Sequence, residues 1–495
     1  MSNVAARRLR VAAVLLAVAA TVTVPAMLGP VRVNDSYWID WVWLDQFARE
    51  LGRGVLYPRW LPDSHAGLGS PVFYYYPPLA FFLGAAFVLA GLPVYPALLA
   101  TFLAGSLLSG VGMYAWLKGQ ARAPLLGATA FMIAPYHACN FYLRGAVAEF
   151  VATAFLPLVM LGLRRVEQRK PYALAATAVA YAALICSHLP LALLASLFLI
   201  APYLAICWRR ERRNLNPMLL ALGAGIALAA IYLVPALMLE HYRDSAKLWE
   251  DPVLQPQNWS FWNAAMPRAY PAMLAIGAAL AVPLAALIVV ERSRWAVLAL
   301  ACVLLGIGLI PLLWALPLLR SVQFPFRIFP IAEFALATAL ASATRKPLVL
   351  GIASLAPLFV TAVIVTGAPP SGGVPMAQLR ALHPDVPENL PPGNRPYSWP
   401  SQWAQAVAQR HRAPQFTDGV TIDPVFYYPA WKVRCGGRPV NAFPDAQTQL
   451  LAYRGQGCER TLGRTPAEYA GTIVSVLALL ALAGASLVRR RRPAA

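Results

Sequence analysis

Seven polar or charged side chains stand at the ends of long apolar runs. They are Asp35, Asp40, Arg144, Glu149, His188, Gln323 and Arg327. Ionisable groups are costly to place near a membrane core, so such groups are candidates for function. A carboxylate there can take up a proton, and a guanidinium can bind two phosphate oxygens at once. Because all seven stand at outward-facing ends of their runs, we expect them to share one polar cavity.

Each of these residues also has a structural interpretation. A single aspartate after an apolar run is equally typical of an exposed loop or of a helix cap. A single arginine, glutamate or histidine at such a place is typical of an interfacial side chain or a structural ion pair. A separate segment adds three more candidates, the cation Arg59 and the aromatic residues Trp60 and Tyr75. Its aromatic residues fit an interfacial belt equally well.

The composition places these residues in a membrane protein. Of the 495 residues, 59% are hydrophobic and only 13% are charged. A helix needs roughly 20 apolar residues to cross a bilayer, and about twelve runs approach this length. We therefore expect an all-α polytopic membrane protein, with helices near residues 11–29, 94–117, 123–140, 146–163, 171–187, 189–208, 217–239, 270–290, 295–316, 328–344, 347–366 and 470–488.

One further apolar run does not fit this scheme. Residues 77–91 begin with two prolines and are short, so we expect a re-entrant or interfacial helix there. With this choice, 21 of the 41 Lys and Arg fall in short segments on one side, which the positive-inside rule makes the cytoplasm. The pattern predicts a bacterial inner-membrane protein with both termini in the cytoplasm. The net charge of +20 then reflects topology, and nucleic acid is not an expected partner.

The domain organisation follows from this topology. Residues 1–366 form the transmembrane domain, which carries a periplasmic first loop at residues 30–76. Residues 470–488 form the last transmembrane helix. No cytoplasmic segment is long enough to fold into a nucleotide-binding domain, so chemistry on nucleotide sugars is not expected.

A second periplasmic segment spans residues 367–469. It opens with a linker rich in Pro and Gly and continues with short runs of Val, Phe and Tyr that are typical of strands. It contains Cys435 and Cys458, which we expect to form a disulfide because the compartment is oxidising. We therefore expect a small β-rich periplasmic domain.

Several motifs together resemble a known family. They are LYPRWLPD, GLGSPVFYYYPPL, YLRGAVAEF, SHLP, QFPFR and FYYPAWKV, and they extend over nearly the whole chain. The chain resembles the bacterial membrane proteins labelled 6-pyruvoyl-tetrahydropterin synthase-related. That family is similar in turn to the GT-C glycosyltransferases, which include oligosaccharyltransferases and aminoarabinose transferases. The chain does not resemble the soluble zinc enzyme that this label suggests.

The resemblance implies a sugar donor carried on a polyprenyl phosphate, and a glycan, lipid or protein as acceptor. It places the acidic residue of the first outer loop at Asp35, with Asp40 as the second candidate. Such a carboxylate removes a proton as the sugar moves. Arg144 and Arg327 are the expected cations for the donor phosphate, and Arg59 is the third. A divalent metal, Mg²⁺ or Mn²⁺, bound by Asp35 stays open.

The remaining candidates complete the expected substrate site. They are Glu149, His188, Gln323, Tyr75 and Trp60. Two other functions stay open alongside a glycosyltransferase. One is a transporter or flippase of a lipid-linked solute, and the other is a non-catalytic envelope assembly protein whose outer domain binds a partner.

Overall fold

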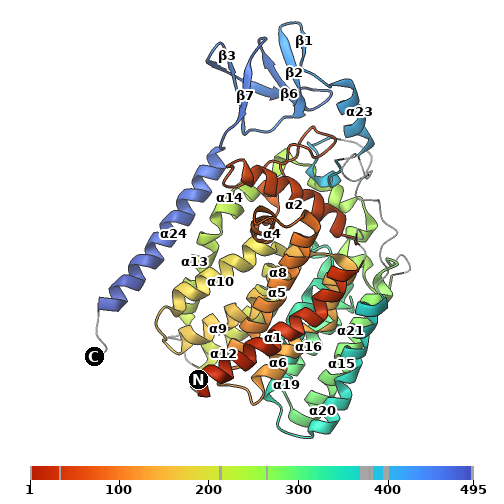
Figure 1. Ribbon diagram of the computed structural model, residues 1–495, viewed down its shortest axis with the longest axis vertical. Coiled ribbons are helices and arrows are strands. Elements are labelled where there is room, and N and C mark those ends of the chain that lie inside the picture. Colours follow the sequence, from red (N-terminus) through yellow and green to blue (C-terminus); the bar gives the residue numbers. More distant parts are fainter. Residues whose placement is uncertain are drawn as a thin grey trace.

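The computed structural model describes residues 3–29, 31–32, 35–210, 215–263, 266–367, 378, 383–393 and 401–491. A bundle of long helices makes up most of the chain, and a small β domain lies at one end of the bundle (Figure 1). The predicted fold class, a helical membrane protein with a small β-rich domain, is confirmed. Most of the predicted linker between helix bundle and β domain lies outside the described residues.

Within the described part of the chain, seven helical stretches are long and apolar enough to cross a membrane. They are Val4–Leu28, Val94–Leu117, Val147–Glu167, Leu189–Arg210, Tyr270–Glu291, Pro347–Gly367 and Pro466–Ala485. A further pair, Leu215–Leu228 and Ala230–Met238, passes the same criteria together but is bent by 65°. The shorter apolar helices do not pass them, so the number of twelve spans stays a prediction.

The elements of the first half of the bundle come in this order: α1 (Asn3–Leu28), α5 (Val94–Leu117), α6 (Pro124–Met132), α7 (Pro135–Cys139), the π-helix η1 (Asn140–Arg144), α8 (Val147–Thr153), α9 (Phe155–Glu167), α10 (Ala173–Ser187), α11 (Leu189–Ala195), the π-helix η2 (Ser196–Ile200) and α12 (Ala201–Arg210). Several expected spans are broken into shorter helices. Pro135 begins α7, where it leaves no helical hydrogen bond unmade because it is the first residue.

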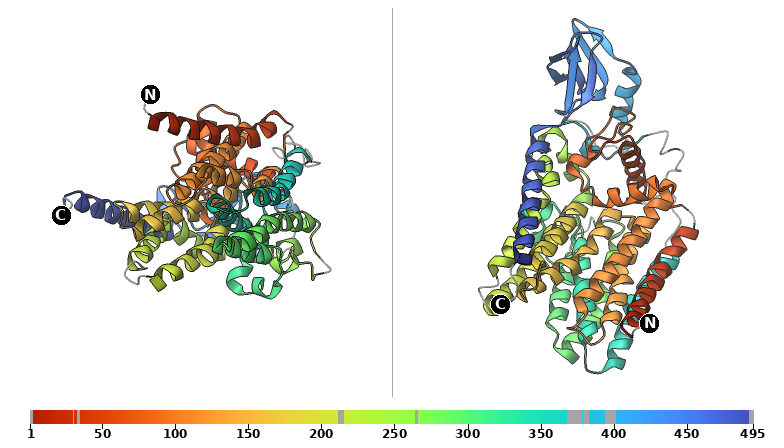
Figure 2. Two further views of the ribbon diagram at one scale, coloured as in Figure 1. Left: turned by 90° about the horizontal axis from the view of Figure 1, so that it is seen from below. Right: turned by 60° about the vertical axis from the view of Figure 1, so that its left-hand side comes forward.

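The helices of the second half of the chain are α13 (Leu215–Leu228), α14 (Ala230–Met238), η4 (Glu240–Tyr242), η5 (Ser245–Trp249), η6 (Pro252–Leu254), η7 (Pro256–Asn258), α15 (Tyr270–Glu291), α16 (Arg294–Gly306), α17 (Pro311–Trp314), α18 (Pro317–Arg320), η8 (Pro325–Ile328), α19 (Phe329–Ser342), α20 (Pro347–Ala353), α21 (Leu355–Gly367), η9 (Pro387–Asn389), α23 (Gln402–Arg410) and α24 (Pro466–Arg491). Helix α23 lies beside the β domain (Figure 1). Helices α1 and α24 lie at the periphery of the bundle (Figure 2).

Three short helices cover the end of the bundle that faces the β domain (Figure 1): α2 (Tyr37–Gly52), α3 (Val72–Tyr75) and α4 (Leu79–Leu89). Helix α4 corresponds to the run expected to be interfacial, and it is too short to cross a membrane alone. Aromatic rings hold α2 against α4. The ring centroids of Phe47 and Phe82 are 4.9 Å apart, and those of Trp43 and Phe81 are 6.1 Å apart.

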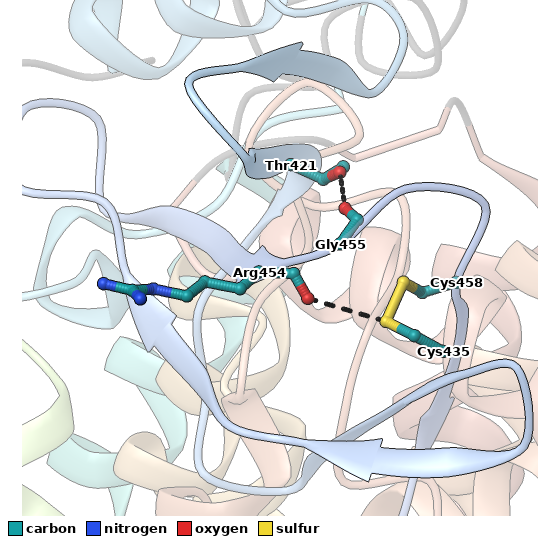
Figure 3. The surroundings of a disulfide bond; sticks show 5 residues. All are labelled: Thr421, Cys435, Arg454, Gly455 and Cys458. Atoms are coloured by element: carbon teal, nitrogen blue, oxygen red, sulfur yellow. Dashed lines mark hydrogen bonds between the residues drawn. A yellow bond between two sulfur atoms is a disulfide. The ribbon is translucent and has the colours of Figure 1, made fainter.

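The β domain consists of two antiparallel sheets. One has the strand order β1-β2-β6-β5 and the other β4-β3-β7. Their bounds are β1 (Gln415–Thr417), β2 (Val420–Phe426), β3 (Trp431–Cys435), β4 (Arg438–Val440), β5 (Ala442–Pro444), β6 (Leu450–Arg454) and β7 (Glu459–Leu462). The expected disulfide between Cys435 and Cys458 is present, and beside it the Thr421 hydroxyl donates to the Gly455 carbonyl (Figure 3).

Candidate functional site

A buried carboxylate, Glu149, lies at the centre of the polar residues. It stands in the first turn of α8 and is only 1% exposed. Its Oε1 accepts hydrogen bonds from the Tyr136 hydroxyl at 2.6 Å and the Asn140 amide at 3.2 Å. Its Oε2 accepts from Arg144 Nη1 at 2.8 Å and from Arg327 Nε at 3.3 Å. These five residues form the Glu149 cluster, in which one buried carboxylate pairs with two guanidinium groups.

Asp35 lies at the rim of the Glu149 cluster. Its Oδ2 is 3.8 Å from Arg144 Nε, and its side chain is 56% exposed. The next residue, Ser36, donates its backbone N–H to the Arg144 carbonyl at 2.8 Å, which holds the first outer loop against the end of η1. Asp35 therefore presents an accessible carboxylate directly beside a buried guanidinium.

Two further predicted residues adjoin the cluster. Gln323 accepts a hydrogen bond from Arg327 Nη1 at 2.9 Å, and so helps to orient that guanidinium. His188 caps α11, because its Nδ1 accepts from the Leu191 N–H at 3.2 Å. This bond leaves Nε2 as the protonated nitrogen of the neutral ring, 3.9 Å from Glu149 Oε2.

The structure thus brings six of the predicted residues together from separate elements. They are Asp35, Arg144, Glu149, His188, Gln323 and Arg327. Two guanidinium groups face one buried carboxylate, and the exposed carboxylate of Asp35 lies beside the remaining positive charge. Such a place suits a phosphate group that approaches beside a proton acceptor.

Asp40 does not share this position, and its predicted catalytic role needs correction. The side chain is 1% exposed, and Oδ2 accepts from the Val147 N–H, at the first residue of α8, at 3.2 Å. Burial raises the pKa of Asp40 to about 8. Asp40 therefore matches the structural alternative, in which an aspartate caps a helix.

Arg59, Trp60 and Tyr75 also lie away from the Glu149 cluster, so the structure does not bring these three predicted residues together with the other six. Arg59 Nε is 3.1 Å from Glu468 Oε1 of α24. The Trp60 ring centroid is 5.4 Å from that of Trp431 in the β domain. The Tyr75 hydroxyl donates to the Leu239 carbonyl at 2.7 Å. These three side chains join the first outer loop to α24, the β domain and the end of α14.

Comparison with known proteins identifies the family. Residues 73–366 match the family described as "6-pyruvoyl-tetrahydropterin synthase related domain; membrane protein". The chain belongs to this family. The matched range includes Arg144, Glu149 and Arg327 of the cluster, whereas Asp35 precedes it. No curated protein matches the sequence.

Two solved structures show a limited similarity to the chain. A mutant form of the arabinofuranosyltransferase AftD from mycobacteria has a TM-score of 0.47 at 20% identity, over 74% of this chain and 29% of that chain. ArnT from Cupriavidus metallidurans in the apo state has a TM-score of 0.41 at 16% identity, over 77% and 68%. The present chain spans less than a third of the AftD chain. At this level, the likeness does not extend to substrate or activity.

Some members of the cluster were missed in the sequence. Tyr136 and Asn140 bond Glu149, and the neighbouring His137 has its Nδ1 2.7 Å from Glu333 Oε2. A signal was present, because a histidine and an asparagine inside an apolar run are expensive and therefore informative.

The described residues do not fit a resident divalent metal. They contain no group of three or more His, Cys, Asp or Glu placed to hold an ion. Asp35 faces the Arg144 guanidinium, and Glu149 is already bonded to Arg144 and Arg327. A Mg²⁺ or Mn²⁺ ion there would be repelled by the two guanidinium groups and would find one accessible carboxylate, that of Asp35. These residues therefore do not fit the metal that the sequence left open.

Gly145 fixes the turn between Arg144 and Glu149, and its replacement should be costly. Its φ is +64°, and a Cβ would lie 2.3 Å from the Tyr37 ring, whose hydroxyl is bonded to the Phe141 carbonyl. Gly145→Ala should destabilise the chain by about 2 kcal/mol more than Gly119→Ala, because overpacking adds to the backbone strain. Gly119 has φ +79° but open space around it. Equal unfolding temperatures of the two purified variants in detergent would contradict this account.

Proposed function

We propose that the chain is a GT-C-type glycosyltransferase that moves a sugar from a polyprenyl-phosphate donor to an envelope glycan, lipid or protein. The observation that carries the proposal is the accessible Asp35 carboxylate, 3.8 Å from the Arg144 guanidinium of the buried Glu149 cluster. The sequence resemblance supports it, because the acidic residue of the first outer loop falls on Asp35.

The proposed reaction uses the groups as they are placed. Asp35 accepts the proton of the acceptor hydroxyl, and the freed oxygen attacks the anomeric carbon of the sugar. The bond between that carbon and the donor phosphate breaks, and the phosphate leaves with the electron pair. Arg144 and Arg327 stabilise the negative charge that grows on the phosphate oxygens. Glu149 and Gln323 hold the two guanidinium groups in place.

The side of the membrane follows from the charge pattern. Helix α20 begins directly after Arg345 and Lys346 and lies at the end of the bundle away from the β domain (Figure 1). The positive-inside rule makes that end cytoplasmic. The Glu149 cluster and the β domain then face the periplasm of a bacterial inner membrane, and both termini are cytoplasmic.

Complementation of a strain that lacks the chain tests the proposal, with mass spectrometry of surface glycans and glycolipids as the readout. Asp35→Asn should lower the rate of transfer by about 100-fold or more, because the proton acceptor is lost. Asp40→Asn should retain activity, because an amide is isosteric with the protonated acid that burial favours. Full activity of Asp35→Asn, at wild-type protein level, would remove the enzymatic proposal.

A further inference from the structure

A large cavity lies apart from the Glu149 cluster. It has a volume of about 1040 Å³, and none of the cluster residues lines it. Its walls come from the segment around Arg59 in the first outer loop, from α4, α14 and α24, and from the β domain. The β domain contributes Trp431, Arg460 and Arg464. The cavity therefore exists only where the helix bundle and the β domain meet.

The polar side of this cavity has an excess of positive charge. It is lined by Arg53, Arg59, Arg460 and Arg464, against the carboxylates of Glu50 and Glu468. Arg53 is paired with Glu50 at 2.6 Å, and Arg460 with Asp423 of β2 at 3.4 Å. Among the described residues, no carboxylate forms an ion pair with Arg464. An anionic group would find uncompensated charge there.

Two buried donors in the cavity wall have no hydrogen-bond partner among the described residues. Arg59 is 6% exposed; its Nε pairs with Glu468, and its Nη2 donates to the Ile231 carbonyl at 2.8 Å. Within the described part of the chain, Arg59 Nη1 and the hydroxyl of Tyr57 have no hydrogen-bond partner. The Arg59 guanidinium carbon is 3.7 Å from the centre of the Tyr57 ring, so the two donors are neighbours. Buried donors are nearly always satisfied in native proteins, which points to an acceptor supplied by a ligand.

Another part of the cavity wall is apolar, and it adjoins Tyr57 and Arg59: the Phe82 ring centroid is 5.6 Å from that of Tyr57, and the Ile231 carbonyl accepts from Arg59. Leu79 and Phe82 come from α4, Cys186 from α10 and Ile231 from α14, all elements of the helix bundle. Hydrocarbon packs well against such a wall, whereas a fully hydrated anion does not. The cationic and apolar parts of the lining together match a molecule with an anionic head and an apolar tail.

We propose that this cavity binds the phosphate group of a membrane amphiphile. Arg59 Nη1 and the Tyr57 hydroxyl donate to the phosphate oxygens, and Arg464 lies on the same cationic side. The hydrocarbon tail contacts Phe82 and Ile231. The site is separate from Asp35 and the Glu149 cluster, so it does not depend on the proposed function.

Native mass spectrometry of the purified full-length chain in detergent tests the site, with dodecyl phosphate as the probe. Tyr57→Phe should weaken binding about tenfold, because it removes one hydrogen bond to a charged group. Arg464→Gln should weaken it roughly threefold, as expected for an exposed charge. Arg438→Gln, an exposed residue of β4 outside the cavity, is the matched control and should bind as the wild type does.

Three comparisons decide the outcome. Unchanged binding by Tyr57→Phe and Arg464→Gln overturns the site. Equal affinity for dodecanol overturns the role of the phosphate, and equal affinity for inorganic phosphate overturns the role of the tail. The Asp35→Asn variant should bind dodecyl phosphate in this cavity as the wild type does, because Asp35 does not line it. A failure of the proposed function would therefore leave this binding result unchanged.

Discussion

Glu149→Gln should destabilise the folded chain by about 3–5 kcal/mol, because it leaves two buried guanidinium groups without their shared carboxylate. Arg144 and Arg327 have side chains that are only 7% and 11% exposed, so water cannot replace the lost charge. A glutamine oxygen can still accept hydrogen bonds, but it cannot balance two positive charges. The measurement is chemical unfolding of the purified variant in mixed micelles.

The matched control is Glu240→Gln. Glu240 also pairs with an arginine, Arg243, at 2.9 Å, but its side chain is 41% exposed. Removing that pair should change stability by less than about 1 kcal/mol, as is usual for exposed ion pairs. If the two variants were equally stable, Glu149 would not be the group that balances the cluster.

Arg144→Lys should lower the rate of sugar transfer by about 100-fold or more while the chain still folds. Arg144 uses one nitrogen, Nη1, to bond Tyr136, Asn140 and Glu149, and turns another, Nε, toward Asp35. A lysine keeps the charge but has a single ammonium group, which cannot bond Glu149 and also face Asp35. Protein level in the membrane and transfer rate, measured together, separate folding from activity.

Arg49→Lys provides the comparison for this substitution. Arg49 pairs with Asp45 and Asp63, but its side chain is 42% exposed and lies outside the Glu149 cluster. Its replacement should leave both protein level and transfer rate unchanged. Wild-type activity of Arg144→Lys would show that the geometry of the guanidinium does not matter, and would contradict the proposed part of Arg144 in transfer.

The helices could be predicted well from the sequence because a bilayer imposes length and apolarity on each one. Residues 94–117 were expected to form a helix, and α5 has these bounds. The breaks could not be predicted so well. One helix was expected at residues 217–239, but Leu215–Leu228 and Ala230–Met238 are two helices bent by 65°. Neighbouring helices can replace the hydrogen bonds that are lost at such a break, and no local sequence pattern reveals those neighbours.

The depth of each site residue in the membrane could be predicted from the sequence, but its position around the helix bundle could not. Charge and hydropathy place a residue along the membrane normal, which is why Asp35, Arg144 and Arg327 were grouped correctly. They do not say which helices are neighbours. Arg59 belongs to the same outer loop as Asp35 but pairs with Glu468 of α24. Asp40 is buried and accepts a hydrogen bond from the start of α8. Only the packing of the helices separates these cases.

Three consecutive tyrosines tie together parts of the protein that are distant in the sequence. Tyr74 donates to Glu468 of α24 at 3.2 Å, and the hydroxyls of Tyr75 and Tyr428 are 3.0 Å apart. The Tyr76 ring centroid lies 4.9 Å from that of Trp43 in α2. One short segment thus contacts α24, the β domain and α2 at once. A rotation of the β domain relative to the helix bundle would disturb these contacts. The angle of the β domain and the position of α2 should therefore change together.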